Sequence, residues 1–207
     1  MNRIEALYSF IDINDKVVDV GCDQAKLGIM LAKRKQSSIA SDVSINVINR
    51  AKKDISILGY DEYIDLRVSD GLAEIKEGET DTLVLSGMGT HTMIDILNKT
   101  KLRFNKIITI SNNNHDILRY EMNKLNYKVS SELIIKENNK YYNLITFVEG
   151  NYDYNDFELN FGMNHVNESM YREYLDFLLN KYKNIKNNSC DKNIKIKKLI
   201  DMLENTF

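Results

Sequence analysis

The sequence contains no proline, no tryptophan and only two cysteines among its 207 residues. Two thiols, Cys22 and Cys190, are too few for a disulfide framework or a zinc site built from cysteines. Without proline, turns must depend on glycine, asparagine and aspartate, which accept tight or left-handed backbone conformations. The three histidines, His91, His115 and His165, are scattered without the spacing of metal ligands, so we expect no metal.

Long hydrophobic runs are also missing. No apolar stretch approaches the roughly twenty residues that a membrane helix needs, and the opening MNRIEALYSF lacks the order of a secretion signal. Hydrophobic residues make up 43% and charged residues 28% of the chain, with a net charge of −2, which is the balance of an ordinary globular protein. We therefore expect a cytoplasmic protein with one main domain and a small appendage.

Strand-like and helix-like segments alternate through about residue 125. β-Branched runs, such as 16–20 and 106–111, are separated by amphipathic segments such as 44–58. This alternation predicts a parallel sheet covered by helices on both faces. Two further runs, 127–137 and 140–150, flank a hairpin-type turn and predict an antiparallel pair. We therefore predict an α/β fold with a mostly parallel, Rossmann-like sheet of seven strands.

After residue 150 the pattern changes to long amphipathic helices. Apolar residues spaced 4, 3, 4 and 3 form the heptad seam of one helix, and three more continue such spacing in a second. The seam consists of Tyr171, Leu175, Leu178, Tyr182 and Ile185, then Ile196, Leu199 and Leu203. We predict a domain at 1–150 and a helical extension at 151–207. The extension forms either a hairpin with a coiled-coil seam that leans away from the domain, or helices that cover the sheet.

The turn after the first strand, VGCDQAKLG, looks like a glycine-rich nucleotide-binding turn with a carboxylate at its centre. Gly21 fits the first glycine of G-x-G-x-x-G, whereas Asp23 and Lys26 occupy the other two positions. A carboxylate beside a pyrophosphate is repelled by roughly several kcal/mol in a partly desolvated cleft, which disfavours a dinucleotide. S-adenosylmethionine has no phosphate and carries an ammonium and a sulfonium group, which Asp19 and Asp23 would attract.

Glycines and carboxylates also follow the next three strands, at the sheet edge where open α/β folds bind ligands. Asp42 stands about twenty residues after the glycine turn, where an acidic side chain can accept both ribose hydroxyls. Asp70 can accept the adenine amine beside Gly71, and Gly87 and Gly89 let the backbone lie close to the sulfur. The predicted cofactor-binding residues are Asp19, Gly21, Asp23, Asp42 with its neighbour Val43, Asp70, Gly71 and Gly87.

Seven segments together resemble a known family. RIEALYSFI, VVDVGCDQAKLGIML, IASDVS, VSDGLAEI, DTLVLSGMGTHTMIDIL, SNNNHDILR and NYKVSSELIIKENNKYYNLITF follow, in order, the pattern of the bacterial tRNA (adenine-N1)-methyltransferases that modify position 22 of tRNA. The resemblance covers most of the chain. It implies a class I, S-adenosylmethionine-dependent methyltransferase domain, a C-terminal coiled-coil-like extension, and cofactor contacts at Asp19, Gly21, Asp42, Asp70, Gly71 and Gly87.

The chain departs from this family at three places. The family reads Ser-Asp-His where residues 22–24 are Cys-Asp-Gln, and it has a proline where Gly28 stands. Its Gln-Pro-Asn after the fifth strand is replaced by SNNN, so that Asn112 and Asn113 are both candidates for the family's asparagine. Loss of the histidine puts a histidine-dependent mechanism in doubt and leaves Asp23 in place.

Methylation of adenine N1 needs orientation more than a strong base, because N1 already carries a lone pair. We hypothesise that Asp23 accepts a hydrogen bond from the adenine amine and stabilises the charge that develops on the ring. The alternative is that Asp23 only holds the cofactor or the loop. The candidate catalytic residues are thus Asp23, Asn112 and Asn113.

A tRNA substrate must open or flip the target base, since N1 lies on its pairing edge. The tail carries a cluster of lysines that can neutralise phosphates, although lysines on a helix are often only a solvated face. These candidate RNA-binding residues are Lys181, Lys183, Lys186, Lys192, Lys195, Lys197 and Lys198. Two alternatives stay open: a catalytically impaired tRNA-binding protein, and a methyltransferase for another RNA or a small molecule. We expect a monomer, although the seam could equally serve a partner chain.

Overall fold

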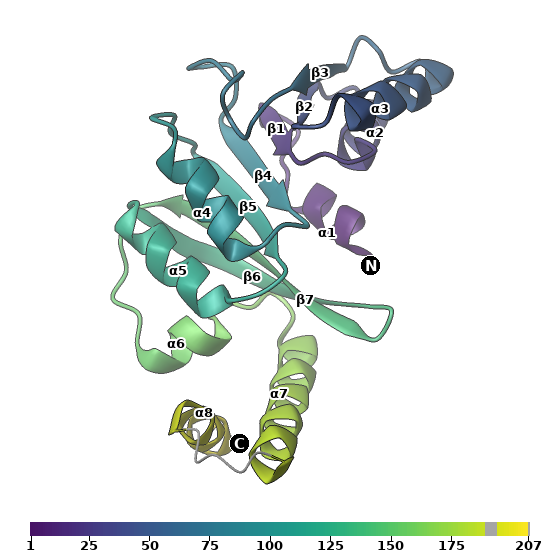
Figure 1. The fold of residues 1–207 in the computed structure, drawn as a ribbon. Coiled ribbons are helices and arrows are strands. Elements are labelled where there is room, and N and C mark those ends of the chain that lie inside the picture. Colours follow the sequence, from purple (N-terminus) through teal and green to yellow (C-terminus); the bar gives the residue numbers. More distant parts are fainter. Residues whose placement is uncertain (189–193, 207) are drawn as a thin grey trace.

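The computed structural model describes residues 1–188 and 194–206. Within these ranges one sheet runs through the molecule, with helices on both faces (Figure 1). Its strand order is β3-β2-β1-β4-β5-β7-β6, and β7 is antiparallel to both of its neighbours. The strands are β1 (Val17–Val20), β2 (Ser38–Asp42), β3 (Ile64–Val68), β4 (Thr82–Ser86), β5 (Lys106–Ser111), β6 (Tyr127–Glu137) and β7 (Lys140–Glu149). The predicted fold class, including the antiparallel pair, is confirmed.

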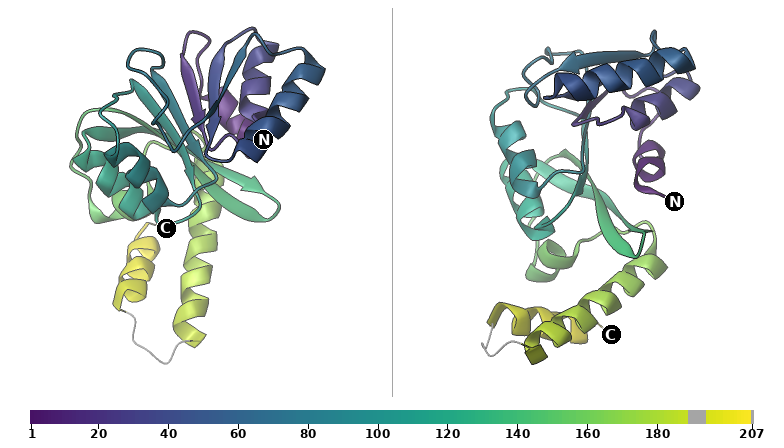
Figure 2. Two further views of the ribbon diagram at one scale, coloured as in Figure 1. Left: turned by 45° about the horizontal axis from the view of Figure 1, so that its top comes forward. Right: turned by 45° about the vertical axis from the view of Figure 1, so that its right-hand side comes forward.

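Eight helices connect and follow these strands in the described part of the chain. Figure 2 shows that the last two lie at the opposite end of the molecule from α2 and α3. The helices are α1 (Arg3–Ser9), α2 (Lys26–Lys33), α3 (Ile45–Leu58), α4 (Thr90–Asn98), α5 (His115–Lys124), α6 (Asp156–Phe161), α7 (Glu168–Asn188) and α8 (Ile194–Glu204). None of the described helices is long and apolar enough to cross a membrane.

Alternation along the strands divides the core between the two faces of the sheet. Val18 of β1 and Leu83 of β4 pack in the cluster that holds α4 and α5. Val17, one position before Val18, and Val84, one position after Leu83, pack with α1 and α2 instead. Because side chains alternate with a period of two, neighbouring apolar residues in these fully buried strands serve opposite faces.

The chain reverses its direction of travel across the sheet at β1. From β1 it moves outward through β2 to β3, then returns to place β4 on the other side of β1. The loops after β1 and β4 therefore diverge at a topological switch point, where open α/β sheets bind ligands. Since β1 to β5 are parallel, the residues that follow all five strands meet at this same edge.

The turns rely on asparagine, as the lack of proline predicts. Of the eight non-glycine residues with positive φ in the described part, five are asparagine. Asn138 and Asn139, with φ of 50° and 60°, form the two-residue turn between β6 and β7. Left-handed values at both central positions match the right-handed twist of the paired strands.

A buried ion pair joins α5 to β6 and holds the chain that follows residue 150. Arg119 binds Glu132 through two hydrogen bonds of 2.9 and 2.6 Å, and both side chains are fully buried. Arg119 also donates to the carbonyl of Leu159 at 2.8 Å, and the Met163 N–H donates to Glu132 at 3.1 Å. A Cβ on Gly162 would lie 2.5 Å from the Glu132 carboxylate, so the packing at this position requires glycine.

The chain after α6 then pairs with the outer edge of β6 at Glu132. The Glu132 N–H donates to the Asn164 carbonyl, and the Val166 N–H donates to the Glu132 carbonyl, at 3.2 and 3.0 Å. This short pairing hides backbone groups of an edge strand that could otherwise bind another chain.

The predicted helical hairpin packs both on itself and on the sheet. Leu175 and Leu178 of α7 are buried against Leu199 and Leu203 of α8 and against Ile134 of β6. The heptad seam therefore serves an intramolecular contact over most of its length, and both interpretations of the extension describe part of it. The domain boundary at residue 150 stays a prediction.

We expect Arg119→Met to destabilise the protein by about 3–5 kcal/mol, because it leaves the Glu132 charge buried without its partner. Urea denaturation followed by circular dichroism measures the change. The control is Lys124→Met, which breaks an exposed pair with Glu121 on the same helix and should cost about 0.5 kcal/mol or less. A loss below about 1 kcal/mol for Arg119→Met would contradict the proposed importance of the pair.

Candidate functional site

The first turn at the switch point has an unusual backbone. Gly21, Asp23 and Ala25 have φ of 77°, 48° and 50°, so every second residue is left-handed. The Gly21 and Cys22 N–H groups both donate to the carbonyl of Ser41, at 2.8 and 3.0 Å, which fixes the turn against β2. A left-handed position explains why related turns use glycine here, and aspartate is among the few other residues that accept it. Strain of this kind clusters at functional sites.

Two carboxylates form the centre of the site. Asp19 in β1 is 7% exposed, and burial together with the nearby Asp42 raises its pKa to about 7. The Asp42 side chain accepts a hydrogen bond from the Ser44 N–H at 2.9 Å. Neither carboxylate has an ion-pair partner in the part of the chain that the structure describes. Such a pair favours a cationic ligand, which would supply the missing positive charge.

Cys22 is buried near these carboxylates, and its thiol is unreactive. Its burial, with the charges of Asp19 and Asp42, raises the pKa of the thiol to about 12. A thiolate is therefore absent at neutral pH, so Cys22 is a packing residue and not a nucleophile. Asp23 and Gln24 beside it are exposed.

The loop after β3 lies next to the end of β2. The Ser69 N–H donates to the Asp42 carbonyl at 3.0 Å. Asp70 is exposed, and its carboxylate lies 3.7 Å from the Lys99 ammonium, so an adenine amine would have to compete with this weak surface pair. Gly71 has φ of 58° and would bring a Cβ within 3.1 Å of Ile96. Val43, also exposed, follows Asp42 directly.

The loops after β4 and β5 are tied to each other. The Asn112 side-chain amide donates to the Gly87 carbonyl at 2.8 Å, and the Asn112 N–H donates to the Met88 carbonyl at 3.1 Å. Asn113 instead accepts a hydrogen bond from the Thr90 N–H at 3.3 Å, at the start of α4. The two candidate asparagines thus differ: Asn112 holds the glycine loop, and Asn113 holds a helix. A Cβ on Gly87 would meet open space, so a ligand can approach its backbone.

Sequence reasoning missed the small hydroxyl residues that connect these loops. The Thr90 and Ser111 hydroxyls lie 2.8 Å apart and both side chains are buried. The Ser69 hydroxyl donates to the Gly71 carbonyl at 2.9 Å. The only signal in the sequence was a polar residue at the end of an apolar run. The structure therefore brings together all the predicted cofactor residues at one sheet edge, with Asn112 and Asn113 beside them.

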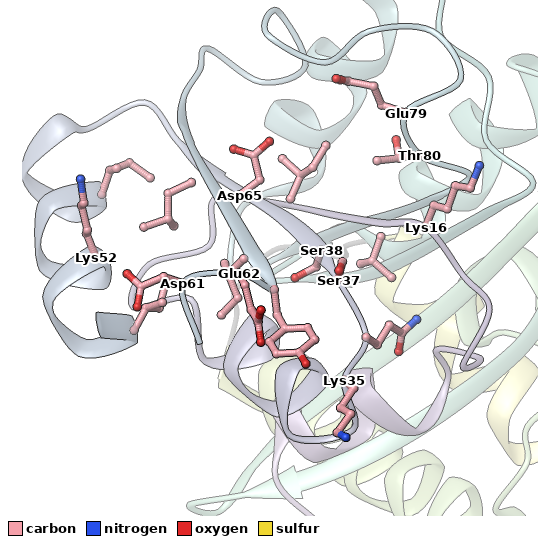
Figure 3. Close-up of a pocket in the computed structure, with 18 of the residues that line it drawn as sticks. Lys16, Lys35, Ser37, Ser38, Lys52, Asp61, Glu62, Asp65, Glu79 and Thr80 are labelled. Atoms are coloured by element: carbon pink, nitrogen blue, oxygen red, sulfur yellow. The ribbon is translucent and has the colours of Figure 1, made fainter. Parts of the chain in front are cut away.

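A separate groove lies elsewhere. It has a volume of about 1000 Å³ and follows the edge strand β3 and the amino ends of β1 and β2 (Figure 3). Lysines such as Lys16 and Lys35 alternate there with acidic side chains such as Glu62 and Glu79. None of the predicted site residues lines this groove, so we do not assign it to the site.

The tail lysines fall into two groups. Three form surface ion pairs: Lys183 with Glu204 at 2.7 Å, Lys195 with Asp116 at 3.4 Å, and Lys198 with Asp156 at 2.6 Å. Lys181, Lys186 and Lys197 are exposed, and within 1–188 and 194–206 none of them forms an ion pair. Lys192 lies outside the described residues.

Comparison with known proteins identifies the family of the main domain. Residues 1–145 match the family model described as "Methyltransferase domain". A curated relative from Bacillus subtilis (strain 168), a tRNA (adenine(22)-N(1))-methyltransferase, is 28% identical over 168 residues, which is 78% of this chain and 71% of the relative.

Two solved structures share nearly the whole fold. M. capricolum TrmK, in complex with S-adenosyl-homocysteine, is 26% identical with a TM-score of 0.86, over 100% of this chain and 96% of that one. Streptococcus pneumoniae Sp1610 is 23% identical with a TM-score of 0.90, over 99% and 98% of the two chains. The likeness includes the helical extension, because it covers at least 99% of this chain in both cases.

We expect Asp19→Asn to stabilise the ligand-free protein, most strongly at pH 8. The folded-state pKa of about 7 lies above the usual 3.8, so stability is lost as the pH rises through 7 and the buried group ionises. The full effect is roughly 4 kcal/mol at most. Thermal unfolding at pH 5 and pH 8 should show the larger gain at pH 8. Asp70→Asn, a change at an exposed carboxylate, is the control. An equal effect of Asp19→Asn at both pH values would show that the folded-state pKa of Asp19 is not raised into this range.

Proposed function

The chain belongs to the methyltransferase-domain family, and we propose that it transfers the methyl group of S-adenosylmethionine to N1 of adenosine 22 in tRNA. The observation that carries this proposal is the pair of carboxylates Asp19, which is buried, and the nearby Asp42, neither of which has an ion-pair partner within residues 1–188 and 194–206. The substrate is supported by the relatives from B. subtilis and M. capricolum, since the alignment with the latter includes the extension as well as the domain.

The residues at the edge fit S-adenosylmethionine. Asp19 and Asp42 offer negative charge to a ligand with two cationic groups, whereas a dinucleotide would bring further negative charge. The open space beside Gly87 gives room for the ligand at the loop after β4. We assign the ribose hydroxyls to Asp42, the cationic methionine end to Asp19, and the adenine amine to Asp70. When bound, the cofactor supplies an electrophilic methyl group.

The chain's own residues orient the acceptor base. Methyl transfer joins the methyl carbon to N1 and breaks its bond to sulfur, so positive charge passes from the sulfonium to the adenine ring and no proton needs to leave. Asp23, exposed at the first turn, can accept a hydrogen bond from the amine of the target adenine and stabilise the charged product. This requires no histidine, which fits Gln24 at the next position.

The two asparagines divide the remaining work. Because the Asn112 side-chain nitrogen donates to the Gly87 carbonyl, its side-chain oxygen is available to accept a hydrogen bond from the amine of the target adenine. The Asn113 oxygen already accepts from Thr90 at the start of α4. We therefore assign base orientation to Asn112 and a supporting role to Asn113.

The extension supplies positive charge for the tRNA backbone. Lys181, Lys186 and Lys197 are exposed and lack ion-pair partners among the described residues, so they can meet phosphates directly. The pairs made by Lys183, Lys195 and Lys198 are exposed, and such pairs contribute only about 0–1 kcal/mol each. A phosphate can replace their carboxylate partners at little cost.

Incubation with labelled S-adenosylmethionine and unmodified tRNA should place one methyl group on N1 of A22. N1-methylation blocks base pairing, so a reverse-transcription stop maps the product. A transcript with guanosine at position 22 is the control and should remain unlabelled. Label at another nucleotide, or in a metabolite panel but not in tRNA, would overturn the proposal, and binding of tRNA without any transfer would favour the catalytically impaired alternative.

Asp42→Ala should weaken S-adenosylmethionine binding by about 1–3 kcal/mol, the loss expected when hydrogen bonds to a charged acceptor disappear. Calorimetry measures it directly. Asp54→Ala, which removes an exposed carboxylate from α3, should bind like the wild type. NAD should bind poorly to all three proteins, because its pyrophosphate would meet the carboxylates. An unchanged affinity for Asp42→Ala would show that the ribose is held elsewhere.

A further inference from the structure

A second cavity, of about 740 Å³, lies between the main body and the extension. Its walls are the β5–α5 loop with Asn112 and Asn113, the tip of the β6–β7 hairpin, and helices α7 and α8. We call it the hairpin cavity. Its volume lies within the range of sites that bind small organic groups, roughly 300–1,000 Å³.

Aromatic rings form one wall of the hairpin cavity. Tyr141 lies 4.8 Å from Phe177 and 5.5 Å from Tyr174, measured between ring centroids. Phe177 lines the cavity and is 42% exposed, so its ring is accessible to a ligand. Tyr174, Phe177 and Tyr182 recur at helical spacing, so one face of α7 presents them together with the neighbouring Lys181.

Positive side chains outnumber negative ones among the described residues that line the cavity. Lys140, Lys181 and Lys195 line the cavity, and Asp116 is the only carboxylate among its described lining residues. Asp116 is already paired with Lys195 at 3.4 Å. Lys140 and Lys181 are exposed and form no ion pair with any residue that the structure describes. Rings and unpaired lysines together are the chemistry that binds single-stranded nucleic acid.

We propose that the hairpin cavity binds an unpaired nucleotide of the tRNA next to the one that is methylated. Its base lies against Tyr141 and Phe177, and its phosphate faces Lys140 and Lys181. This inference rests on the proposed function, and it adds a second nucleotide site to the methyl-transfer site.

The position of the cavity separates the two nucleotides. Asn112 belongs both to the cavity wall and to the loop that binds Gly87, so one RNA strand can pass from one site to the other. Gly21, Asp23 and Gly87 do not line the cavity, so we place the target base at those residues and the neighbouring base on Phe177. Binding of a neighbouring nucleotide stabilises the RNA conformation in which this strand is unpaired. In that conformation the target base can leave its pairing partner.

Phe177→Ala tests the aromatic wall. Loss of one stacked base should raise the KM for tRNA about tenfold, with S-adenosylmethionine affinity unchanged. Phe177→Tyr, which keeps the ring, should restore the wild-type KM. Circular dichroism establishes that both variants are folded. Equal values of KM for the wild type and Phe177→Ala would overturn the inference.

Lys181→Gln tests the charge at an exposed position where folding is not at risk. It should reduce the magnitude of the negative slope of log affinity against log salt by about 0.7, the value for one phosphate of a single strand. Lys53→Gln, at an exposed site on α3, is the control for loss of one charge and should leave the slope unchanged. Lys186→Gln, on α7 outside the cavity, is the comparison on the same helix. Equal losses for Lys181→Gln and Lys186→Gln, with no effect of Phe177→Ala, would show diffuse attraction by the helix and overturn the cavity site.

Ultraviolet crosslinking of unmodified tRNA identifies the nucleotide. Peptides that contain Tyr141 or Phe177 should crosslink to a neighbour of A22 and not to A22 itself. Crosslinks to A22 would make the cavity the target-base site and contradict the inference. Binding of AMP in the cavity, with the KM for tRNA unchanged in Phe177→Ala and Lys181→Gln, would identify a free nucleotide as the ligand. That result would also overturn the inference. A wild-type protein that does not methylate tRNA overturns the proposed function and this inference with it, whereas wild-type methylation with unaffected variants overturns the inference alone.

Discussion

The buried pair of Arg119 and Glu132 governs how the two parts of the molecule fit together. Removing two charges from water costs several kcal/mol per ion, on the order found for buried pairs, so every remaining hydrogen-bonding atom needs a partner. Those partners, the Leu159 carbonyl and the Met163 N–H, come from the chain after the sheet. The start of the extension is therefore fixed by the electrostatics of α5 and β6. Helix α7 follows directly, and with it the position of the hairpin cavity opposite the β5–α5 loop.

A net charge of −2 conceals two regions of opposite sign on the same sheet edge. Asp19, Asp23 and Asp42 lie at the carboxyl ends of β1 and β2, while the hairpin cavity presents Lys140 and Lys181. A methyl donor with two positive groups and a polyanionic RNA need surroundings of opposite sign. Their separation along one edge lets both approach a common point near Asn112 without either charge region repelling the other ligand. The overall charge, as read from composition, says nothing about this arrangement.

Hydrophobic periodicity is a local property, which is why the strands, the sheet and the hairpin helices could be predicted. The common place of the carboxylates could be predicted as well, since residues that follow parallel strands share an edge, whereas their role as cofactor ligands stays a prediction. Helix α6 and the segment 162–166 could not, because their places depend on Arg119 and Glu132, which in the sequence look like ordinary surface charges. Asn112 and Asn113 were indistinguishable as neighbours, and only their hydrogen bonds to different loops separate their roles.

The pairing of residues 164 and 166 with Glu132 can form only late in synthesis, because these residues are translated after β6. The ribosome adds about 5–20 residues per second, so β6 emerges some seconds before the segment that covers its outer edge. During that interval the strand presents free backbone groups beside a half-completed buried charge pair. A neighbouring nascent chain can pair with such an edge. Premature termination shortly after β7 would leave this part of the edge unpaired permanently, so the pairing of residues 164 and 166 protects part of β6 from contact with other chains.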